Sequence, residues 1–135
     1  MPVGRTKDAG WQIGVSRTVH QPLGEVWDLL TGPVGSSIWL GAGVAFPAEP
    51  GEGYETTAGT TGEVRSYQER RRIRLTWHPA DWSHDSTVQI TLQPTPSGTS
   101  IRFHQDRLAD AAERERQRDH WRAVLDRIIA ELPGR

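Results

Sequence analysis

The stretch WRAVLDRIIAEL at residues 121–132 decides how this chain folds. Its large apolar side chains recur at i, i+3, i+4, i+7, i+8 and i+11, the spacing of one helix face: Trp121, Val124, Leu125, Ile128, Ile129 and Leu132. Asp110 and Glu113 have the spacing of a capping box, and Pro133-Gly134 is a stop signal. We therefore predict a helix of about 22 residues, roughly 33 Å long. Its hydrophobic contact is expected from Trp121 onward, because residues 111–117 carry no large apolar side chain.

The segments before this helix have the period of strands with one apolar face. Alternation of apolar and polar residues marks strands at 11–19, 63–69, 72–77, 87–93 and around Phe103. The inward side chains of the two clearest strands are Ile73, Leu75, Trp77, Val88, Ile90 and Leu92. Turn residues separate consecutive strands, and each strand has one polar face, so the pattern favours an antiparallel sheet.

Two short helices are expected between the first strand and the rest of the sheet. Leu23, Val26, Trp27 and Leu30 form a helical stripe after Pro22, and a second piece carries Val34, Ile38 and Trp39. A brief strand around Tyr54 follows among turns. The order predicts an α+β fold in which a curved antiparallel sheet wraps around the long C-terminal helix. We expect a flexible tail over residues 1–10 and a single domain over 11–135.

Composition excludes several classes of protein. The chain has 135 residues, a formal net charge of -1 and no cysteine, so disulfides, thiolate nucleophiles and iron–sulfur clusters are ruled out. The near-zero charge argues against broad attraction to nucleic acid or to anionic membranes. No apolar run approaches the ~20 residues of a membrane span, and no signal peptide is visible at the N-terminus, so a soluble cytoplasmic protein is expected.

Six tryptophans are the outstanding feature of the composition. Trp27, Trp77 and Trp121 lie on predicted apolar faces, where core packing is the simplest interpretation and lining of an apolar pocket is compatible with it. Trp39 and Trp82 lie in segments rich in glycine, proline, serine or histidine. Either of these two could cap a pocket mouth or pack on a loop.

The chain resembles the family of proteins similar to the C-terminal domain of activator of Hsp90 ATPase, over roughly residues 11–132. The matching pieces, in order, are Val19-His20-Gln21-Pro22 with Val26-Trp27, Trp39, Pro50-Gly51-Glu52-Gly53, Gly62-Glu63-Val64, Leu75-Thr76-Trp77, Val88-Gln89-Ile90-Thr91-Leu92, Gly98-Thr99-Ser100-Ile101 and Trp121. One departure is His120, at a position where the family often has glycine. The eukaryotic activator also has an N-terminal domain that this chain is too short to contain.

The resemblance implies a helix-grip fold of the START-like superfamily, with an apolar cavity between the sheet and the C-terminal helix. Members bind hydrophobic or polyketide-like molecules, and related lineages catalyse cyclisation or hydrolysis. Our candidates for ligand contact are Trp39, Trp77, Trp82, Val88, Ile90, Phe103, His120, Trp121, Val124 and Leu125.

Polar clusters offer weaker hypotheses. Residues 78–85 contain two His and two Asp, but a flexible loop without a helical His pair favours a solvated segment over a metal site. His104 and Asp106 share a strand face opposite Phe103, which points them to water unless a bulge intervenes. Arginines at 70–72 and 74 are interpreted as a solvated sheet face, since Glu63, Glu69 and Asp106 argue against nucleic-acid binding.

The leading hypothesis is a non-enzymatic protein that binds a hydrophobic, polyketide- or lipid-like molecule in its cavity, with no cofactor and no metal. One alternative is a cyclase or hydrolase that uses His104, Asp106 or Glu63 inside the cavity. Two further alternatives are self-resistance to an enediyne-type natural product by sequestration and an Hsp90-type chaperone interaction module. A homodimer is left open.

Overall fold

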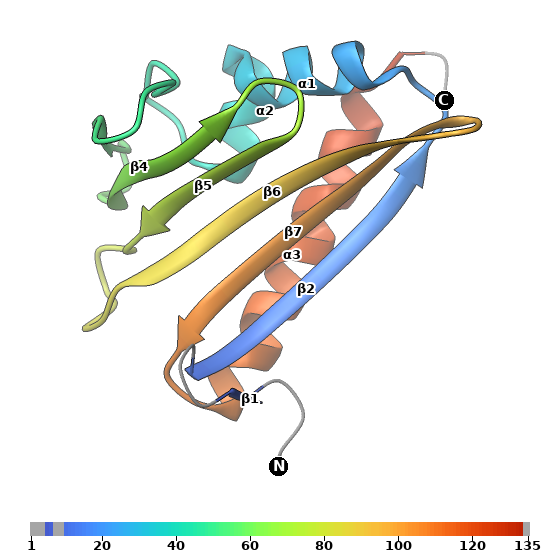
Figure 1. The fold of residues 1–135 in the computed structure, drawn as a ribbon. Coiled ribbons are helices and arrows are strands. Elements are labelled where there is room, and N and C mark those ends of the chain that lie inside the picture. The colour runs from blue at the N-terminus through green and yellow to red at the C-terminus, as the bar shows by residue number, and fades with distance from the viewer. Residues whose placement is uncertain (1–4, 7–9, 134–135) are drawn as a thin grey trace.

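The computed structural model describes residues 5–6 and 10–133. Seven antiparallel strands form one sheet in the order β1-β2-β7-β6-β5-β4-β3. The strands are β1 (Arg5–Thr6), β2 (Gly10–Val19), β3 (Gly53–Glu55), β4 (Thr61–Gln68), β5 (Arg72–Trp77), β6 (Ser86–Thr95) and β7 (Gly98–Leu108). In Figure 1 the sheet lies in front of the long helix α3 (Ala111–Glu131), with α1 (Leu23–Thr31) and α2 (Pro33–Trp39) at one end.

Local sequence explains where the helices begin and end. The Asp110 carboxylate accepts a hydrogen bond from the Glu113 backbone N–H at 2.8 Å, and the Glu113 carboxylate accepts from the Ala109 N–H at 2.9 Å. This reciprocal cap confirms the predicted start of α3. Pro33, which lacks an N–H, occupies the first turn of α2, where no donor is needed.

The core forms between the inner face of the sheet and the apolar stripe of α3. The most fully buried side chains include Phe103, Leu75, Ile73, Ile90, Ile101, Trp121, Leu125 and Ile128. Thus the stripe at residues 121–132 and the alternation in the central strands are confirmed, and so is the helix-grip class of fold. The buried apolar side chains of α3 begin at Trp121, as expected, and two polar side chains of its earlier turns, Glu113 and Gln117, are buried as well.

The predicted tail falls mostly outside the described residues. Of residues 1–10, the backbone of Arg5–Thr6 pairs with Gly10 and Trp11. No helix in the described part of the chain is both long and apolar enough to cross a membrane.

Candidate functional site

A row of aromatic rings follows the interface between the sheet and α3. The ring of Phe103 lies 6.3 Å from Trp39 and stacks on Trp121 at 5.0 Å, with the two planes 15° apart. The Trp121 ring lies 5.7 Å from Trp77, and Trp77 meets Trp82 edge to face at 5.4 Å. We call these five residues the aromatic row. Contacts of this kind each stabilise by about 0.5–1.5 kcal/mol beyond the area they bury.

Secondary structure brings these rings together. Trp39 ends α2, Phe103 is on the inner face of β7, Trp77 ends β5, and Trp121 starts the apolar stripe of α3. Trp82 is in the loop of residues 78–85 between β5 and β6 and is only half-buried. The row therefore runs from the deep core at Trp39 to the surface at Trp82.

Gln105 organises a buried polar cluster beside the row. Its Oε1 accepts hydrogen bonds from Trp121 Nε1 at 2.8 Å and from Gln117 Nε2 at 2.9 Å. Its Nε2 donates to Ser86 Oγ at 2.9 Å, and that hydroxyl donates to the Trp77 carbonyl at 2.6 Å. Every polar end of the Gln105 amide is thus used, and the indole of Trp121 is held in one orientation.

The two other deeply placed indoles differ in their hydrogen bonding. Trp39 Nε1 donates to the Leu30 carbonyl at 2.8 Å. Trp77 Nε1 is buried and has no partner among the described residues. A buried donor without an acceptor costs about 1–3 kcal/mol, so it marks a place where an acceptor from outside the chain would be stabilising.

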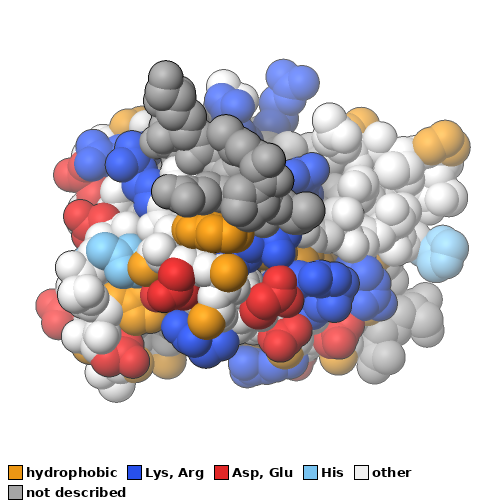
Figure 2. All heavy atoms as spheres, turned by 90° about the horizontal axis from the view of Figure 1, so that it is seen from below, with side chains coloured by type: hydrophobic (Ala, Val, Ile, Leu, Met, Phe, Trp, Pro, Cys, Tyr) orange, Lys and Arg blue, Asp and Glu red, His pale blue; other side chains and the backbone are white. Residues whose placement is uncertain are grey.

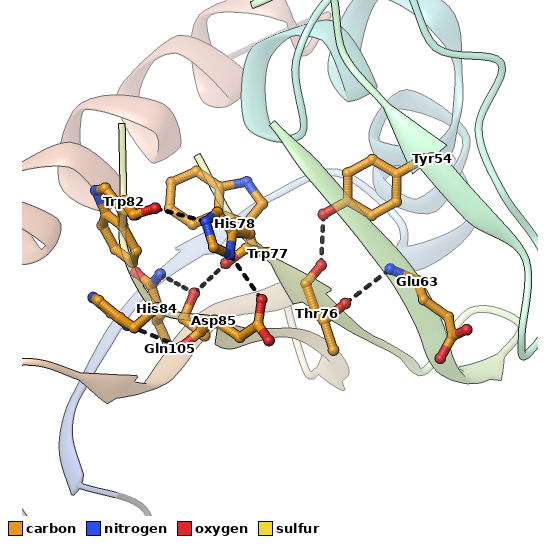
Figure 3. A network of polar contacts seen from close by, with 10 residues as sticks. Tyr54, Glu63, Thr76, Trp77, His78, Trp82, His84, Asp85 and Gln105 are labelled. Carbon is orange, nitrogen blue, oxygen red and sulfur yellow. Dashed lines mark hydrogen bonds and ion pairs between the residues drawn. The ribbon is translucent and has the colours of Figure 1, made fainter. Parts of the chain in front are cut away.

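The loop of residues 78–85 closes over the exposed end of the row (Figure 3). His78 Nδ1 lies 2.8 Å from Asp85 Oδ1, and its Nε2 lies 2.7 Å from the Trp82 carbonyl. The His84 ring stacks on Trp82 at 4.7 Å, and its Nε2 lies 2.8 Å from Glu113 Oε1. The loop therefore contacts the start of α3 through one imidazole–carboxylate pair, while Ala80, Asp81, Ser83 and Asp85 are exposed to solvent.

Hydrogen bonding and burial shift the imidazoles in opposite directions. The hydrogen bond that the His78 ring donates to the Asp85 carboxylate raises the pKa of His78, with a smaller contribution from the Trp82 carbonyl. His120 is an exposed residue, but its ring packs against Trp121 at 4.7 Å and Trp77 at 6.0 Å. This loss of hydration lowers the pKa of His120, and the Arg127 charge lowers it further.

The residues predicted to contact a ligand lie in one region, where most of their side chains are packed together in the core. Among them, Trp39, Trp77, Val88, Ile90, Phe103, Trp121, Val124 and Leu125 are buried in a single core cluster. Trp82 and His120 lie at its surface end. Leu125 also borders a surface hollow of about 420 Å³ between β2 and α3. In this structure these side chains pack against one another.

The candidate catalytic side chains lie elsewhere. His104 and Asp106 are on the outer face of the sheet, on the side away from α3, because the bulge opposite Gln12 falls beyond Gln105. The Glu63 carboxylate pairs with Arg65 at 2.9 Å, and in Figure 3 it points away from the aromatic rings. Over residues 5–6 and 10–133, no three His, Asp or Glu side chains gather as metal ligands.

Sequence reasoning missed the polar residues of the site. Gln105 is in phase with the buried Ile101 and Phe103, which was the available signal for an inward amide. Glu113 was recognised only as a cap, and Gln117 was not singled out. Their burial depends on how deeply the start of α3 sits on the sheet, and this depth has no signature in local periodicity.

Comparison with known proteins identifies relatives. A family model described as activator of Hsp90 ATPase homolog 1-like protein matches residues 20–132. No curated protein matches the sequence.

Solved structures share the fold at low identity. CalU16 from Micromonospora echinospora is 21% identical, with 96% of this chain and 80% of that chain covered and a TM-score of 0.75. DynU16, a protein in the dynemicin biosynthetic locus, is 20% identical, with 91% and 47% covered and a TM-score of 0.78. Protein MLL2253 from Mesorhizobium loti is 23% identical, with 88% and 94% covered and a TM-score of 0.72. With the family model spanning most of its length, the chain belongs to the family of activator of Hsp90 ATPase homolog 1-like proteins.

Proposed function

We propose that the protein binds a flat, apolar small molecule between the sheet and α3, where Trp82 covers Trp77, and that it does so without catalysis. The observation that carries the proposal is the buried, unpartnered Nε1 of Trp77 at the surface end of the aromatic row. Two side chains of the surface end cover the Trp77 ring: Trp82, which is half-buried and meets it at 5.4 Å, and His120, whose ring lies 6.0 Å away.

The chemistry of this end of the row favours a ring-bearing ligand with an acceptor oxygen. Stacking on Trp77 and Trp121 supplies apolar contact area, and a carbonyl or phenol oxygen would accept from Trp77 Nε1. Aromatic polyketides combine these two properties, whereas an aliphatic lipid offers no stacking. The ligand would replace the Trp82 side chain, whose ring contacts include Trp77 edge to face and the stacked imidazole of His84.

The position of the ionisable groups supports binding over turnover. His104 and Asp106 lie on the far side of the sheet, and Glu63 is paired with Arg65. Two imidazoles touch the row: His84 stacks on Trp82, and His120 packs against Trp77 and Trp121. The lowered pKa of His120 favours its neutral form at physiological pH. A neutral imidazole at the surface end of the aromatic row is compatible with an apolar ligand.

The proposal is tested by titrating alizarin, a planar dihydroxyanthraquinone, while following tryptophan fluorescence. We expect saturable quenching, and Trp77→Phe should weaken binding about 5- to 15-fold, because it removes one hydrogen bond but keeps an aromatic ring. Trp39→Phe is the matched control and should bind as tightly as the parent, since the Trp39 donor is already used by Leu30.

Dodecanol serves as the aliphatic comparison and should bind more weakly than alizarin. Trp82→Ala should bind alizarin at least as well as the parent, because the covering ring is gone. The proposal fails if neither the parent nor Trp82→Ala responds to alizarin up to its solubility limit, or if Trp77→Phe and Trp39→Phe are indistinguishable from each other.

A second candidate is protection against a reactive natural product by sequestration at the same place. The observation that favours it is the TM-score of 0.78 with DynU16, a protein in the dynemicin biosynthetic locus. Its test is incubation with reductively activated dynemicin, followed by intact-mass measurement and a DNA-cleavage assay. Protection of the DNA, with or without scission of the chain, supports this function, and undiminished DNA cleavage contradicts it.

A further inference from the structure

The outer face of the sheet carries a polar hollow that the proposed function does not use. This hollow has a volume of about 460 Å³ and lies on the side away from α3. Its lining comes from β2, β5, β6 and β7: Ser16, Arg74, Gln89, Thr91, Gln93, Ser100, Arg102 and His104. We call it the outer hollow. Its lining contains two guanidinium groups, one imidazole, three hydroxyls and no carboxylate.

Strand register explains why these groups converge. Thr91 pairs with Arg102 across β6 and β7, and Arg102 pairs with Ser16 across β7 and β2. In the adjacent row, Gln89 pairs with His104. Side chains at directly paired positions on one face are about 5 Å apart, so the hydroxyls flank the Arg102 guanidinium.

Arg102 is the central group of the outer hollow and is not neutralised. Within the described part of the chain, its guanidinium has neither an ion-pair partner nor a side-chain hydrogen bond. It lies over Gly14, where a Cβ atom would be 2.7 Å from Arg102 Nη2. The absence of a side chain at Gly14 therefore provides the space in which this guanidinium lies flat on the sheet.

The second cation, Arg74, is held in place by an ion pair and a hydrogen bond. Its Nη2 lies 3.4 Å from Asp106 Oδ2, and its Nη1 donates to Gln89 Oε1 at 3.2 Å. Asp106 offsets one of the two positive charges, so the hollow and its support keep one net positive charge. The face of the molecule in Figure 2 differs from the outer hollow in its charge pattern, because acidic and basic side chains lie next to each other across it.

His104 completes the site. Its Nε2 lies 2.8 Å from Gln12 Oε1, so a neutral ring donates there and leaves Nδ1 as an acceptor. Partial burial lowers the pKa of His104, and the Arg102 and Arg74 charges lower it further, while the Asp106 charge acts in the opposite direction. An anion bound beside these arginines would reverse part of that shift, which makes His104 a reporter of the site.

We propose that the outer hollow binds the phosphate group of a small molecule through Arg102, Arg74 and the surrounding hydroxyls. A phosphate has three acceptor oxygens, and guanidinium forks with nearby hydroxyl donors match them better than they match a two-oxygen carboxylate. The volume accommodates a phosphate with a small organic group attached. The site lies on the opposite side of the sheet from the aromatic row and shares no lining residue with it.

The experiment follows the His104 ring signals by NMR during titration at low salt and neutral pH. The probes are inorganic phosphate, phenyl phosphate as an organic monoester, and benzoate as the matched carboxylate. We expect phenyl phosphate to shift the His104 signals saturably and benzoate to bind at least about tenfold more weakly. Tighter binding of phenyl phosphate than of inorganic phosphate indicates a phosphorylated organic ligand, and the reverse indicates free phosphate.

Two variants test the geometry, and one is a control. Arg102→Gln should weaken phenyl phosphate about tenfold or more, because it removes a charge-assisted contact. Gly14→Ala keeps every charge but displaces the guanidinium, so it should weaken binding severalfold. Arg116→Gln, at an exposed position on α3, should leave the affinity unchanged. Thermal unfolding of each variant verifies that it is folded.

The proposal is overturned by any of three results: no shift at His104 with either phosphate, benzoate binding as tightly as phenyl phosphate, or Arg116→Gln weakening binding as much as Arg102→Gln. Parent-like affinity in Gly14→Ala would equally contradict the placement of the guanidinium. Because the probes leave the aromatic row untouched, tryptophan fluorescence should not change, and failure here leaves the alizarin test unaffected.

Discussion

Replacing Gln105 by leucine is expected to destabilise the protein far more than its change in volume suggests. Leucine fills similar space and is more apolar, so packing alone predicts a small effect. However, Trp121 Nε1 and Gln117 Nε2 both lose their acceptor, and both atoms are buried beside it. Each orphaned donor costs about 1–3 kcal/mol, and the apolar side chain gains about 1 kcal/mol, so we expect a net loss of roughly 1–5 kcal/mol.

Urea unfolding followed by far-ultraviolet circular dichroism measures this loss. Gln68→Leu, at an exposed position at the end of β4, is the matched control and should change stability by less than about 0.5 kcal/mol. The double variant Gln105→Leu/Gln117→Leu removes one orphaned donor and should recover about 1–2 kcal/mol. A loss below about 1 kcal/mol for Gln105→Leu would refute the reasoning that Gln105 holds Trp121 in place.

Three further outcomes are expected. Glu113→Gln removes the charge that holds His84, so acrylamide should quench tryptophan fluorescence more strongly, and unchanged quenching would contradict the loop contact. The pKa of His104 is lowered in the folded state, so the free energy of unfolding should fall as pH drops below about 6.5, where the unfolded chain takes up the proton first. His104→Gln should make this fall smaller in urea unfolding at a series of pH values. The same pH dependence in parent and variant would contradict the role of His104. Gly35→Ala would force a Cβ atom into the Leu29 carbonyl and should cost about 3 kcal/mol or more in urea unfolding, whereas a near-neutral result would show that α1 and α2 separate easily.

The fold was predictable because its main elements have strong periodicity. The stripe from Trp121 to Leu132 and the alternation at Ile73, Leu75 and Trp77 each identify a buried face without reference to the rest of the chain. Together they require a sheet packed on one helix, and the structure has this arrangement.

The polar part of the site was not predictable in the same way. Gln105 alternates in phase with apolar neighbours, yet glutamine is more often exposed. Its burial follows from its hydrogen-bond partners on α3, Gln117 and Trp121, which only the structure reveals. The loop at 78–85 has a composition typical of solvent exposure, and the contact of His84 with Glu113 joins segments far apart in sequence, so local pattern could not predict it. The outer hollow likewise depends on register, which places Arg102 beside Gly14.

A single carboxylate oxygen contacts both the loop of residues 78–85 and the backbone just before α3. Glu113 Oε1 accepts from the Ala109 N–H at 2.9 Å and also lies 2.8 Å from His84 Nε2. If the loop lifted with His84, this oxygen would lose one partner and hydrate, and the first turn of α3 would lose part of its anchor. Hydrogen exchange at the Ala109 amide therefore reports, from the helix end, how often the aromatic row opens to solvent.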